Sequence, residues 1–511
     1  MTSKKIIIIA SLLAIIPLAE NIFPKRFNTY NSNIVFSAQR YQDSKLLYLA
    51  KSISVRIEGA TKGSGVIVKK EGDIYTVLTA WHVIKDNLIT EEVGIITSDN
   101  EEHIWEPINL KRLGKVDLAL FTFRSKNLYK TASIGDAKVV NYKDQVYVAG
   151  FSVFDFKNLK FEKGEIVANA EVGIDNGYQM LYSNKTTSGM SGGVILDKRG
   201  RLIGIHGRGE VDLNKSSISK IKVKTGINQG IPITFFEMFN KGLPVELPKG
   251  SYKKPDDYLA QAWASQEKEG REQSVLRLVN QALKINRFIP EAYFLKAYIN
   301  GELNNYQLAI QNYTEAIKID PNNSNSFINR GLQKKDMGNI KGALNDFNKA
   351  IKLDPNSGAA YHARALSLDT LGRIKDAMND YNYALELEPS DGLIYYNRGS
   401  AKYAQNDFKG ALIDFNNAIE NNELGADVFY NRALTKYNLR DLQGSLKDYS
   451  SSILIDPSQG SAYANRGLIR GELGDEKGLC LDAKKAASLE DEITKNYLRS
   501  DEGAWCRNMT N

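Results

Sequence analysis

The run T-T-S-G-M-S-G-G occupies Thr186–Gly193, between two apolar runs at Tyr178–Tyr182 and Val194–Leu196. Glycines on both sides of one serine allow a tight turn, because glycine adopts backbone angles that other residues avoid. Such a turn presents the Ser191 hydroxyl outward and directs the backbone N–H groups of Gly189 and Ser191 at one point, where a developing oxyanion would lie. Ser191 is therefore a candidate nucleophile, although a glycine-rich run by itself is more often only a turn.

A serine hydroxyl needs an imidazole to take its proton and a carboxylate to orient that imidazole. Among the four histidines of the chain, His82 follows the strand-like alternating run Tyr75–Ala80. The candidate carboxylate is Asp117, at the mouth of the apolar strand Leu118–Phe121. Taken singly, His82 is explained as a capped core histidine and Asp117 as a turn residue. Together with Ser191, in the order His, Asp, Ser, they predict a catalytic triad.

The motifs Thr79-Ala80-Trp81-His82, Asp117-Leu118-Ala119-Leu120 and Gly189-Met190-Ser191-Gly192-Gly193 resemble those of the chymotrypsin-like (trypsin-like) serine proteases. The resemblance covers residues 52–240 and implies an all-β double barrel, two six-stranded antiparallel barrels with the triad in the cleft between them. Many relatives carry Asp or Asn directly before the nucleophile, where this chain has Met190. This departure argues against activation by a freed N-terminal amine, so we expect a protease that folds active. Alternating segments independently predict short strands at Ser52–Ile57, Gly65–Val68 and Val146–Ala149.

The resemblance extends to the specificity pocket. In the glutamyl endopeptidase subgroup of this family, a histidine on the strand after the serine and a threonine five residues before it bind an acidic side chain. His206 and Thr186 match these places, and an imidazole facing a carboxylate is a physical reason for such a preference. The resemblance thus implies cleavage after Glu, and also after Asp. The other interpretation of His206 is a strand residue satisfied by local backbone, and Lys185 either adds positive charge or is a solvated surface group.

Residues 257–490 repeat with a period of 34 residues. Acidic residues precede proline at Asp320-Pro321, Asp354-Pro355, Glu388-Pro389 and Asp456-Pro457. Small residues recur at Ala309, Ala343, Ala377 and Ala411, and aromatic residues four positions later at Tyr313, Phe347, Tyr381 and Phe415. This order resembles the tetratricopeptide repeat, with two antiparallel helices per unit. It predicts six to seven units that stack into an all-α helical-repeat solenoid, whose concave groove would bind a protein partner.

Two charged residues recur within the same units. Arginine occupies one repeat position, at Arg330, Arg364, Arg398, Arg432 and Arg466. Aspartate occupies another, at Asp346, Asp380, Asp414, Asp448 and Asp482. The arginines alone would form a stripe for acidic ligands, but charge-paired packing between helices is the simpler account. We therefore assign no ligand residues in the groove.

The N-terminal segment and the junction between the two halves differ in composition from the rest of the chain. Residues 1–19 contain a basic start and the apolar run Ile6–Ala19, which is short for a membrane span and of the length of a signal-peptide core. Export with cleavage and an uncleaved N-terminal anchor both stay open. Residues 20–51 are mixed and polar and predict a lead-in outside the core. Residues 241–256, rich in proline and lysine, predict a solvated linker that does not pack.

The only two cysteines, Cys480 and Cys506, lie around the last repeat and the C-terminal cap at residues 491–511. In an exported protein they would form a disulfide bond that holds the last helix. In a cytosolic protein they would be free, buried thiols.

Composition limits the remaining classes of function. A chain of 511 residues with 42% apolar content has room for two or three domains. The net charge of +7 comes without basic clusters, so we expect no nucleic-acid partner. The motifs of metal and nucleotide sites do not occur in the sequence, so neither a metal nor a cofactor is expected.

The sequence therefore predicts a serine endopeptidase acting on protein or peptide substrates. It would be exported to the periplasm or the medium, or anchored in the membrane and facing outward, with membrane contact only if the N-terminal segment is uncleaved. The alternative is a repeat-based interaction scaffold with an inactive or inhibited protease-like module.

Overall fold

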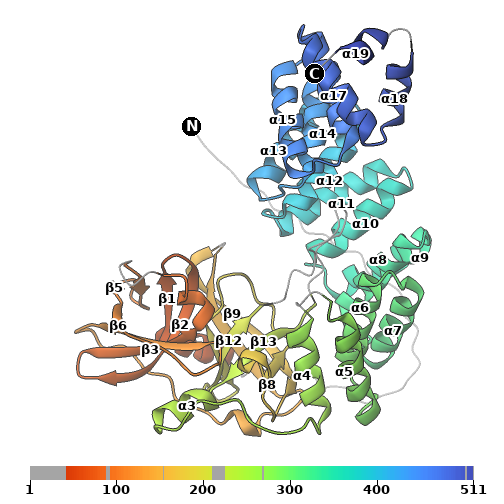
Figure 1. The fold of residues 1–511 in the computed structure, drawn as a ribbon. Helices are drawn as coiled ribbons and strands as arrows, with labels where there is room; N and C mark the ends of the chain where they lie inside the picture. The colour runs from red at the N-terminus through yellow and green to blue at the C-terminus, as the bar shows by residue number, and fades with distance from the viewer. Residues whose placement is uncertain are drawn as a thin grey trace, which may run out of the picture.

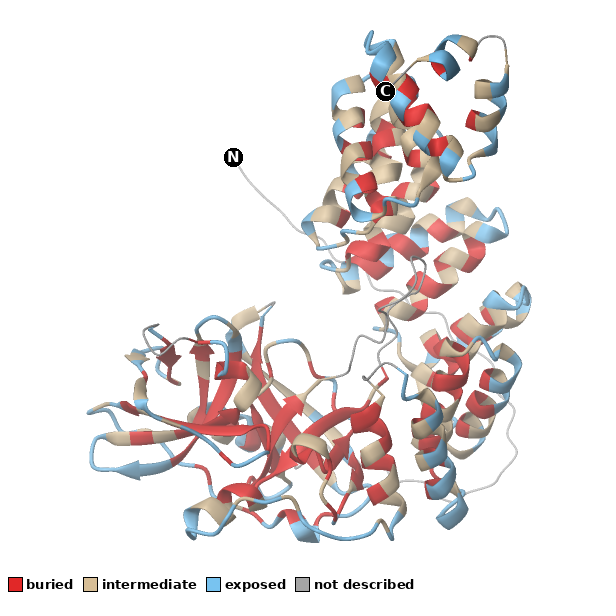
Figure 2. Cartoon of the chain, in the orientation of Figure 1, coloured by how far each residue is buried: buried red, intermediate tan, exposed pale blue. Residues whose placement is uncertain are grey.

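The structure is a computed structural model that describes residues 42–87, 92–153, 155–209, 225–266, 270–500 and 503–509. A β-rich N-terminal domain is followed by a long array of helices that rises from its side (Figure 1). Buried residues concentrate in the strands and on the inner faces of the helices (Figure 2). The predicted fold class is confirmed, whereas the expected signal segment at residues 1–19 lies outside the described residues.

The first sheet of the β-rich domain has seven strands in the order β5-β4-β1-β2-β3-β7-β6. Its strands are β1 (Ser54–Glu58), β2 (Lys62–Glu71), β3 (Ile74–Ala80), β4 (Gly94–Ile96), β5 (Glu102–Ile104), β6 (Glu106–Arg112) and β7 (Leu118–Arg124). The edge strands carry exposed apolar side chains such as Ile104 and Ile108. Within the described ranges this sheet stays open, so the expectation of a first six-stranded barrel is wrong in this respect.

The second sheet is a closed barrel in the order β10-β13-β12-β11-β8-β9. Its strands are β8 (Gln145–Ser152), β9 (Asp155–Asn169), β10 (Met180–Tyr182), β11 (Val194–Asp197), β12 (Leu202–Arg208) and β13 (Asn228–Pro232). The short helices η1 (Ala137–Val139) and η2 (Asp175–Gly177) lie in its connections, and α3 (Thr234–Asn240) follows the last strand. Six strands therefore enclose one core, as expected for the second barrel.

A helix at residues 42–53 precedes the first strand. Three of its residues recur at helical spacing and join the core cluster that contains Tyr147 of the second barrel: Leu46, Ala50 and Ile53. The expectation that residues 20–51 lie outside the core is wrong for this helix. Its apolar stripe is short and is diluted by charged residues, so composition alone conceals it.

The helical array consists of antiparallel pairs from α4 and α5 to α16 and α17. The helices are α4 (Pro255–Ser265), α5 (Glu272–Ile285), α6 (Pro290–Glu302), α7 (Tyr306–Ile319), α8 (Ser324–Asp336), α9 (Ile340–Leu353), α10 (Gly358–Thr370), α11 (Ile374–Leu387), α12 (Gly392–Ala404), α13 (Phe408–Glu420), α14 (Ala426–Asn438), α15 (Leu442–Ile455), α16 (Gly460–Glu472), α17 (Glu476–Ser488), α18 (Glu492–Arg499) and α19 (Ala504–Asn508). The small and aromatic residues of the 34-residue pattern are buried, including Ala343, Phe347 and Ala350. The pattern therefore marks the packing positions of stacked helix pairs.

The repeated arginines and aspartates pair within each unit. Arg398 donates to both carboxylate oxygens of Asp414, at 2.9 and 2.6 Å. Its third donor, Nη1, reaches Asn382 of the preceding unit at 2.7 Å. The same arrangement recurs at Arg330, Arg364, Arg432 and Arg466. Charge-paired packing is confirmed, and we call each such group an arginine clasp.

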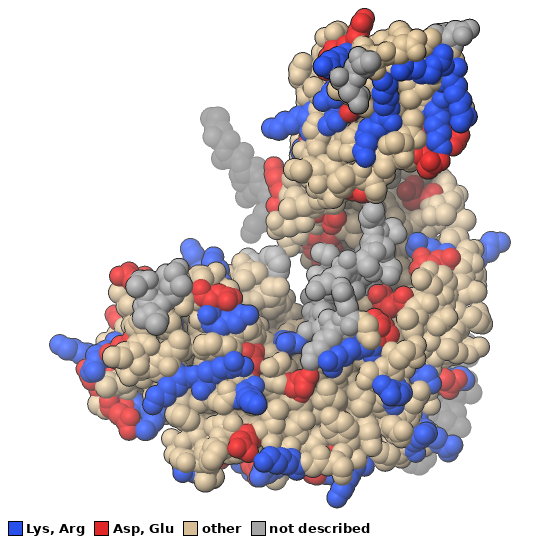
Figure 3. Space-filling view, viewed as in Figure 1, with Lys and Arg blue, Asp and Glu red and all other residues tan. Residues whose placement is uncertain are grey.

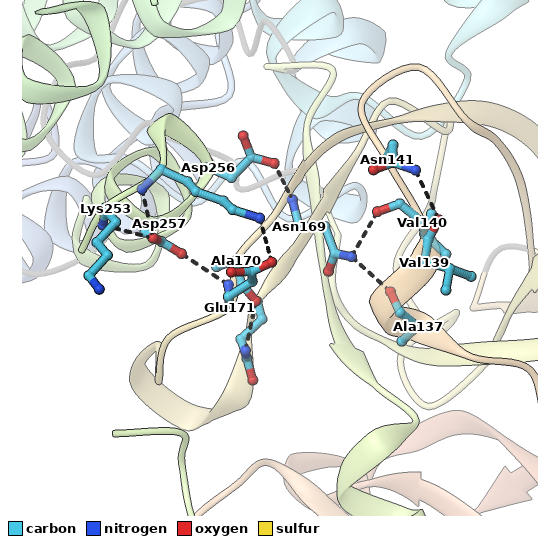
Figure 4. Close-up of polar contacts among 12 residues, drawn as sticks. Ala137, Val139, Val140, Asn141, Asn169, Ala170, Glu171, Lys253, Asp256 and Asp257 are labelled. Atoms are coloured by element: carbon cyan, nitrogen blue, oxygen red, sulfur yellow. Dashed lines mark hydrogen bonds and ion pairs between the residues drawn. The ribbon is translucent and has the colours of Figure 1, made fainter. Parts of the chain in front are cut away.

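The predicted linker packs on the second barrel. Val245 and Leu247 are half-buried against its core, and the Pro248 carbonyl accepts a hydrogen bond from the Gly173 amide at 2.8 Å. Figure 4 shows Asp256 and Asp257 of α4 reaching the barrel. The expectation that residues 241–256 do not pack is wrong, because the alternating apolar residues between the prolines find a surface that composition does not reveal.

The C-terminal end of the array is closed by a disulfide bond between Cys480 and Cys506. On the face drawn in Figure 3, Lys and Arg gather over the C-terminal repeats, whereas both signs of charge are interspersed on the β-rich domain. None of the described helices is both long enough and apolar enough to span a membrane.

Candidate active site

His82 and Asp117 are joined by two hydrogen bonds. His82 lies in the short helix α2 (Trp81–Ile84), which begins directly after β3. Its backbone N–H donates to Asp117 Oδ1 at 2.9 Å, and its Nδ1 lies 2.6 Å from Asp117 Oδ2. Because a carboxylate only accepts, the proton lies on Nδ1 and the basic lone pair of the neutral ring lies on Nε2. This is the tautomer that a general base requires.

Asp117 is held from a second direction by the segment before β10. The Tyr178 hydroxyl donates to Asp117 Oδ2, and the Asp117 amide donates to the Asn176 carbonyl at 2.9 Å. Burial alone would raise the pKa of the Asp117 carboxyl, but the hydrogen bonds from His82 and Tyr178 outweigh it and hold the pKa below its ordinary value. The carboxylate is therefore ionised at neutral pH, although Asp117 is buried.

Ser191 lies in the turn between β10 and β11, at the seam between the two sheets. Its carbonyl accepts a hydrogen bond from the Ser64 amide of β2 at 2.9 Å, and the next residue, Gly192, donates to the His206 carbonyl of β12 at 2.7 Å. Gly192 has a φ of 83°, and a side chain there would collide with the Ser64 carbonyl. The turn therefore requires glycine at this position.

The turn that carries Ser191 lies near helix α2, which carries His82. A side chain at Gly63 would meet both Val83, the neighbour of His82, and the Ser191 carbonyl. In the described part of the chain, no hydrogen bond joins the Ser191 hydroxyl to His82. Catalytic hydrogen bonds are often long in free enzymes and shorten when substrate binds. The structure therefore joins His82 to Asp117 directly and places the Ser191 turn near the helix that carries His82.

The proposed oxyanion donors lie in the same turn. Gly189 has a φ of 94°, and its carbonyl accepts a hydrogen bond from the Ser64 hydroxyl at 3.1 Å. Within the ranges that the structure describes, neither the Gly189 nor the Ser191 N–H donates to another protein group. Met190, between them, is fully buried in the second barrel.

His206 and Thr186 lie next to each other and are buried. The Tyr182 hydroxyl lies 2.5 Å from His206 Nδ1, whereas His206 Nε2 has no hydrogen-bond partner in the described chain. The Thr186 hydroxyl donates to the Asn228 side chain. A side chain at Gly209 would come within 3.2 Å of Thr186 Oγ1 and 4.0 Å of His206 Nε2. Burial lowers the pKa of His206 to about 3, so the ring is neutral in the free protein.

Lys185 points away from this pair. Its Nζ forms an ion pair with Asp354 Oδ2 at 2.9 Å, and Asp354 lies at the end of α9 in the repeats. Lys185 is therefore a surface group that contacts the helical array.

Sequence reasoning did not identify three supporting residues of the site: Tyr178, Tyr182 and Asn228. Each is far along the chain from the residue it contacts, and no local motif surrounds it. Among the described residues, no cluster of His, Cys, Asp or Glu is placed to hold a metal ion.

Comparisons with known proteins identify two regions of the chain. Residues 63–205 match the model of the trypsin-like peptidase domain. Residues 290–323 and 329–392 match models of the tetratricopeptide repeat. The chain thus contains a trypsin-like peptidase domain followed by tetratricopeptide repeats.

Among curated proteins, the chain is similar to a serine protease HtrA-like of Staphylococcus aureus (strain USA300), with 29% identity over 153 residues. The match covers 28% of this chain and 19% of that protein, so the chain spans about a fifth of the length of this relative.

Among solved structures, the chain is similar to the APC/C hetero-tetramer Cut9-Hcn1, with a TM-score of 0.42 and 14% identity over 49% of each chain. It is also similar to YrrB, a TPR protein with an unusual peptide-binding site, with a TM-score of 0.33 and 20% identity over 37% of this chain and 97% of that one.

Proposed function

We propose that the protein is a serine endopeptidase with Ser191, His82 and Asp117 as its triad. The observation that carries this proposal is the His82–Asp117 pair, which two hydrogen bonds join, close to the turn that contains Ser191. His82 Nε2 takes the Ser191 proton as Oγ attacks the peptide carbonyl, and then gives that proton to the leaving amine. In the second step, water attacks the acyl group on Ser191 while His82 again takes the proton, and the acid product leaves. The Gly189 and Ser191 N–H groups hold the oxyanion in both steps.

Labelling with a fluorophosphonate serine probe tests this proposal. The wild-type protein is expected to be labelled, whereas the Ser191→Ala and His82→Ala variants are not. Ser188→Ala, in the same turn, is the matched control: it keeps Ser191 and should still be labelled. Absence of labelling in a folded wild-type protein would favour the alternative, a repeat scaffold with an inactive protease-like module.

The second part of the proposal is a preference for Glu, and also Asp, before the cleaved bond. If Tyr182 donates to His206 Nδ1, the ring proton lies on Nε2 and faces Thr186 without a partner. If a bound substrate carboxylate raises the pKa of the ring and the ring takes a second proton from water, Nδ1–H donates to the Tyr182 oxygen, and the Tyr182 hydroxyl donates a hydrogen bond to the Gln229 carbonyl at 3.2 Å. Both arrangements offer Nε2–H to a carboxylate, which supports an acidic preference.

A peptide library with varied residues before the cleaved bond tests this preference. Cleavage after Glu and Asp is expected, and His206→Ala should reduce kcat/KM for the Glu substrate far more than for its Gln counterpart. Cleavage after Lys, Arg or aromatic residues, or an unchanged preference in His206→Ala, would contradict the assignment. Lys185→Ala is the control for a general effect of positive charge.

Export is the third part of the proposal. The Cys480–Cys506 disulfide supports an oxidising compartment, because such bonds are rare in cytosolic proteins. The N-terminal basic start and apolar run are the expected signal or anchor. We propose a periplasmic or extracellular location, with a protein partner bound in the groove of the repeats. Fractionation of cells, with intact mass of the recovered protein, tests both location and cleavage.

A further inference from the structure

A loop in the second barrel touches both the catalytic aspartate and the helical array. This loop, residues 169–178, begins at the last residue of β9 and ends just before β10. At its C-terminal end, the Asn176 carbonyl accepts from the Asp117 amide at 2.9 Å and the Tyr178 hydroxyl donates to Asp117 Oδ2. Asp117 is therefore held through both its main chain and its side chain by one loop.

The position of the Tyr178 ring depends on a glycine. A Cβ atom at Gly207 would lie 2.2 Å from Tyr178 Cε1, so any other residue at that place would displace the ring. The Arg208 guanidinium, from the same strand β12 as Gly207, lies 4.7 Å from the centroid of the Tyr178 ring. Tyr178 is buried, and the pKa of its hydroxyl is raised by burial and by the charge of Asp117, so it remains a donor. The ring is thus fixed with its O–H directed at the carboxylate.

The N-terminal half of the same loop is held by the helical array. The Asn169 amide donates to Asp256 Oδ2 and the Glu171 amide donates to Asp257 Oδ1, both at 2.9 Å (Figure 4). The Gly173 amide donates to the Pro248 carbonyl at 2.8 Å. Three alternate amides of the loop therefore donate to acceptors from the linker and α4, two of them side-chain carboxylates and one a backbone carbonyl.

Apolar contacts and a buried charge strengthen this attachment. Val172 and Ile174 of the loop belong to one core cluster with Leu259 and Trp263 of α4. Asp257 is buried, and its Oδ2 accepts from the Lys253 and Lys254 amides at 3.1 and 3.0 Å (Figure 4). A buried carboxylate with three amide donors is costly to lose, because its partners then lack an acceptor.

We propose that Tyr178 is a positioning residue for Asp117 and that α4 of the repeats, through Asp257, holds the loop that carries it. The inference rests on the proposed function. The repeats are then part of the support of the active site, and a partner that moves α4 changes the rate of acylation. The competing explanation is that Tyr178 is only a core residue and Asp257 only a helix cap.

Tyr178→Phe tests the first half, because it removes one hydroxyl and keeps the ring. We expect the rate of fluorophosphonate labelling to fall about tenfold, as for the loss of one hydrogen bond to a charged group. The second readout is the NMR signal of the His82 Nδ1 proton, which is expected to shift because Asp117 Oδ2 loses a competing donor. An unchanged labelling rate with an unchanged His82 signal would overturn the positioning role. Gly207→Ala, which displaces the ring, should reproduce the change.

Asp257→Ala tests the second half in the full-length protein. We expect labelling to slow by roughly threefold or more, with the same change in the His82 signal, because the loop loses one of its amide acceptors. The control is Asp441→Ala, which removes an aspartate that caps α15 through the Gly444 amide, in the same array and without contact to the loop. Equal effects of the two substitutions, or no effect of either, would overturn the coupling.

The NMR signal separates this inference from the proposed function. If the wild-type protein is not labelled by the probe, the protease proposal fails. The response of the His82 signal to Tyr178→Phe and Asp257→Ala still reports whether the loop holds Asp117.

Discussion

The two halves of the chain use the same kinds of contact in opposite ways. In the protease domain, one aspartate, Asp117, is the acceptor for His82 and Tyr178, and the described chain provides no second copy of this group. In the repeats, an arginine clasp occurs in five consecutive units. A single substitution can abolish the activity of a site that occurs once. In an array of similar units, the same kind of substitution removes only one of several equivalent contacts. The two halves should therefore respond very differently to the removal of a single side chain.

The largest expected effect is that of Ser191→Ala. Without the nucleophile, peptide hydrolysis should fall by about a millionfold, leaving only the contribution of the oxyanion donors and substrate binding. Steady-state hydrolysis of a Glu peptide, with thermal unfolding as the control for folding, measures it. Residual hydrolysis near the wild-type rate would place the nucleophile elsewhere.

Asp117→Asn should have the next largest effect. The amide keeps the shape of the side chain but favours the wrong tautomer of His82, so kcat is expected to fall by about ten thousandfold. The unfolding temperature should change far less than after a loss of core packing. A fall of less than tenfold in kcat would show that Asp117 does not orient the base.

The clasps are expected to show a smaller and graded effect. Asp414 pairs with Lys402 at 2.8 Å as well as with Arg398, whereas the equivalent position beside Asp380 is Leu368. Arg364→Ala should therefore destabilise the array by about 3 kcal/mol, and Arg398→Ala by about 1 kcal/mol, because a lysine remains near the buried carboxylate. Urea unfolding measures both. Equal losses would show that the lysine does not compensate, and neither substitution should alter labelling of Ser191.

The last predicted effect depends on pH and lies at the boundary of the two halves. Burial, with a contribution from Asp320, raises the pKa of Glu291 in α6 to about 7, and its Oε2 has no hydrogen-bond partner in the described chain. The unfolded chain releases this proton near pH 4.5, so the folded protein loses stability as the pH rises from there through 7. Glu291→Gln should remove about 2 kcal/mol of this loss. Unfolding free energies at pH 5 and pH 8 measure it, and an unchanged difference between the two would contradict the prediction.

Much of both halves could be predicted because their signals are local. Each of the three site motifs consists of a few neighbouring residues: Thr79–His82, Asp117–Leu120 and Gly189–Gly193. The 34-residue pattern occurs several times, so each unit supports the prediction of the others. The packing of the linker could not be predicted, because the partners of Pro248 and Asp257 are surfaces assembled from the second barrel. The role of Tyr178 depends on the absence of a side chain at Gly207, and no pattern in the sequence joins these two positions. In the described ranges, the first sheet is open because its edge strands β5 and β6 do not pair with each other. The alternation of apolar and polar residues along a strand does not show whether such a pairing forms.

The clasps also have a consequence for the length of the array. Each end of the array makes a contact that the middle units do not make. At the first end, α4 is hydrogen-bonded to the second barrel, and at the other end the Cys480–Cys506 bond holds the C-terminal cap. Between them, each arginine needs only an aspartate in its own unit and a polar side chain in the unit before it. Duplication of one 34-residue unit from this middle region would supply both partners at each new boundary. The number of units, and with it the length of the array, can therefore change during evolution without a change in the contacts between α4 and the second barrel.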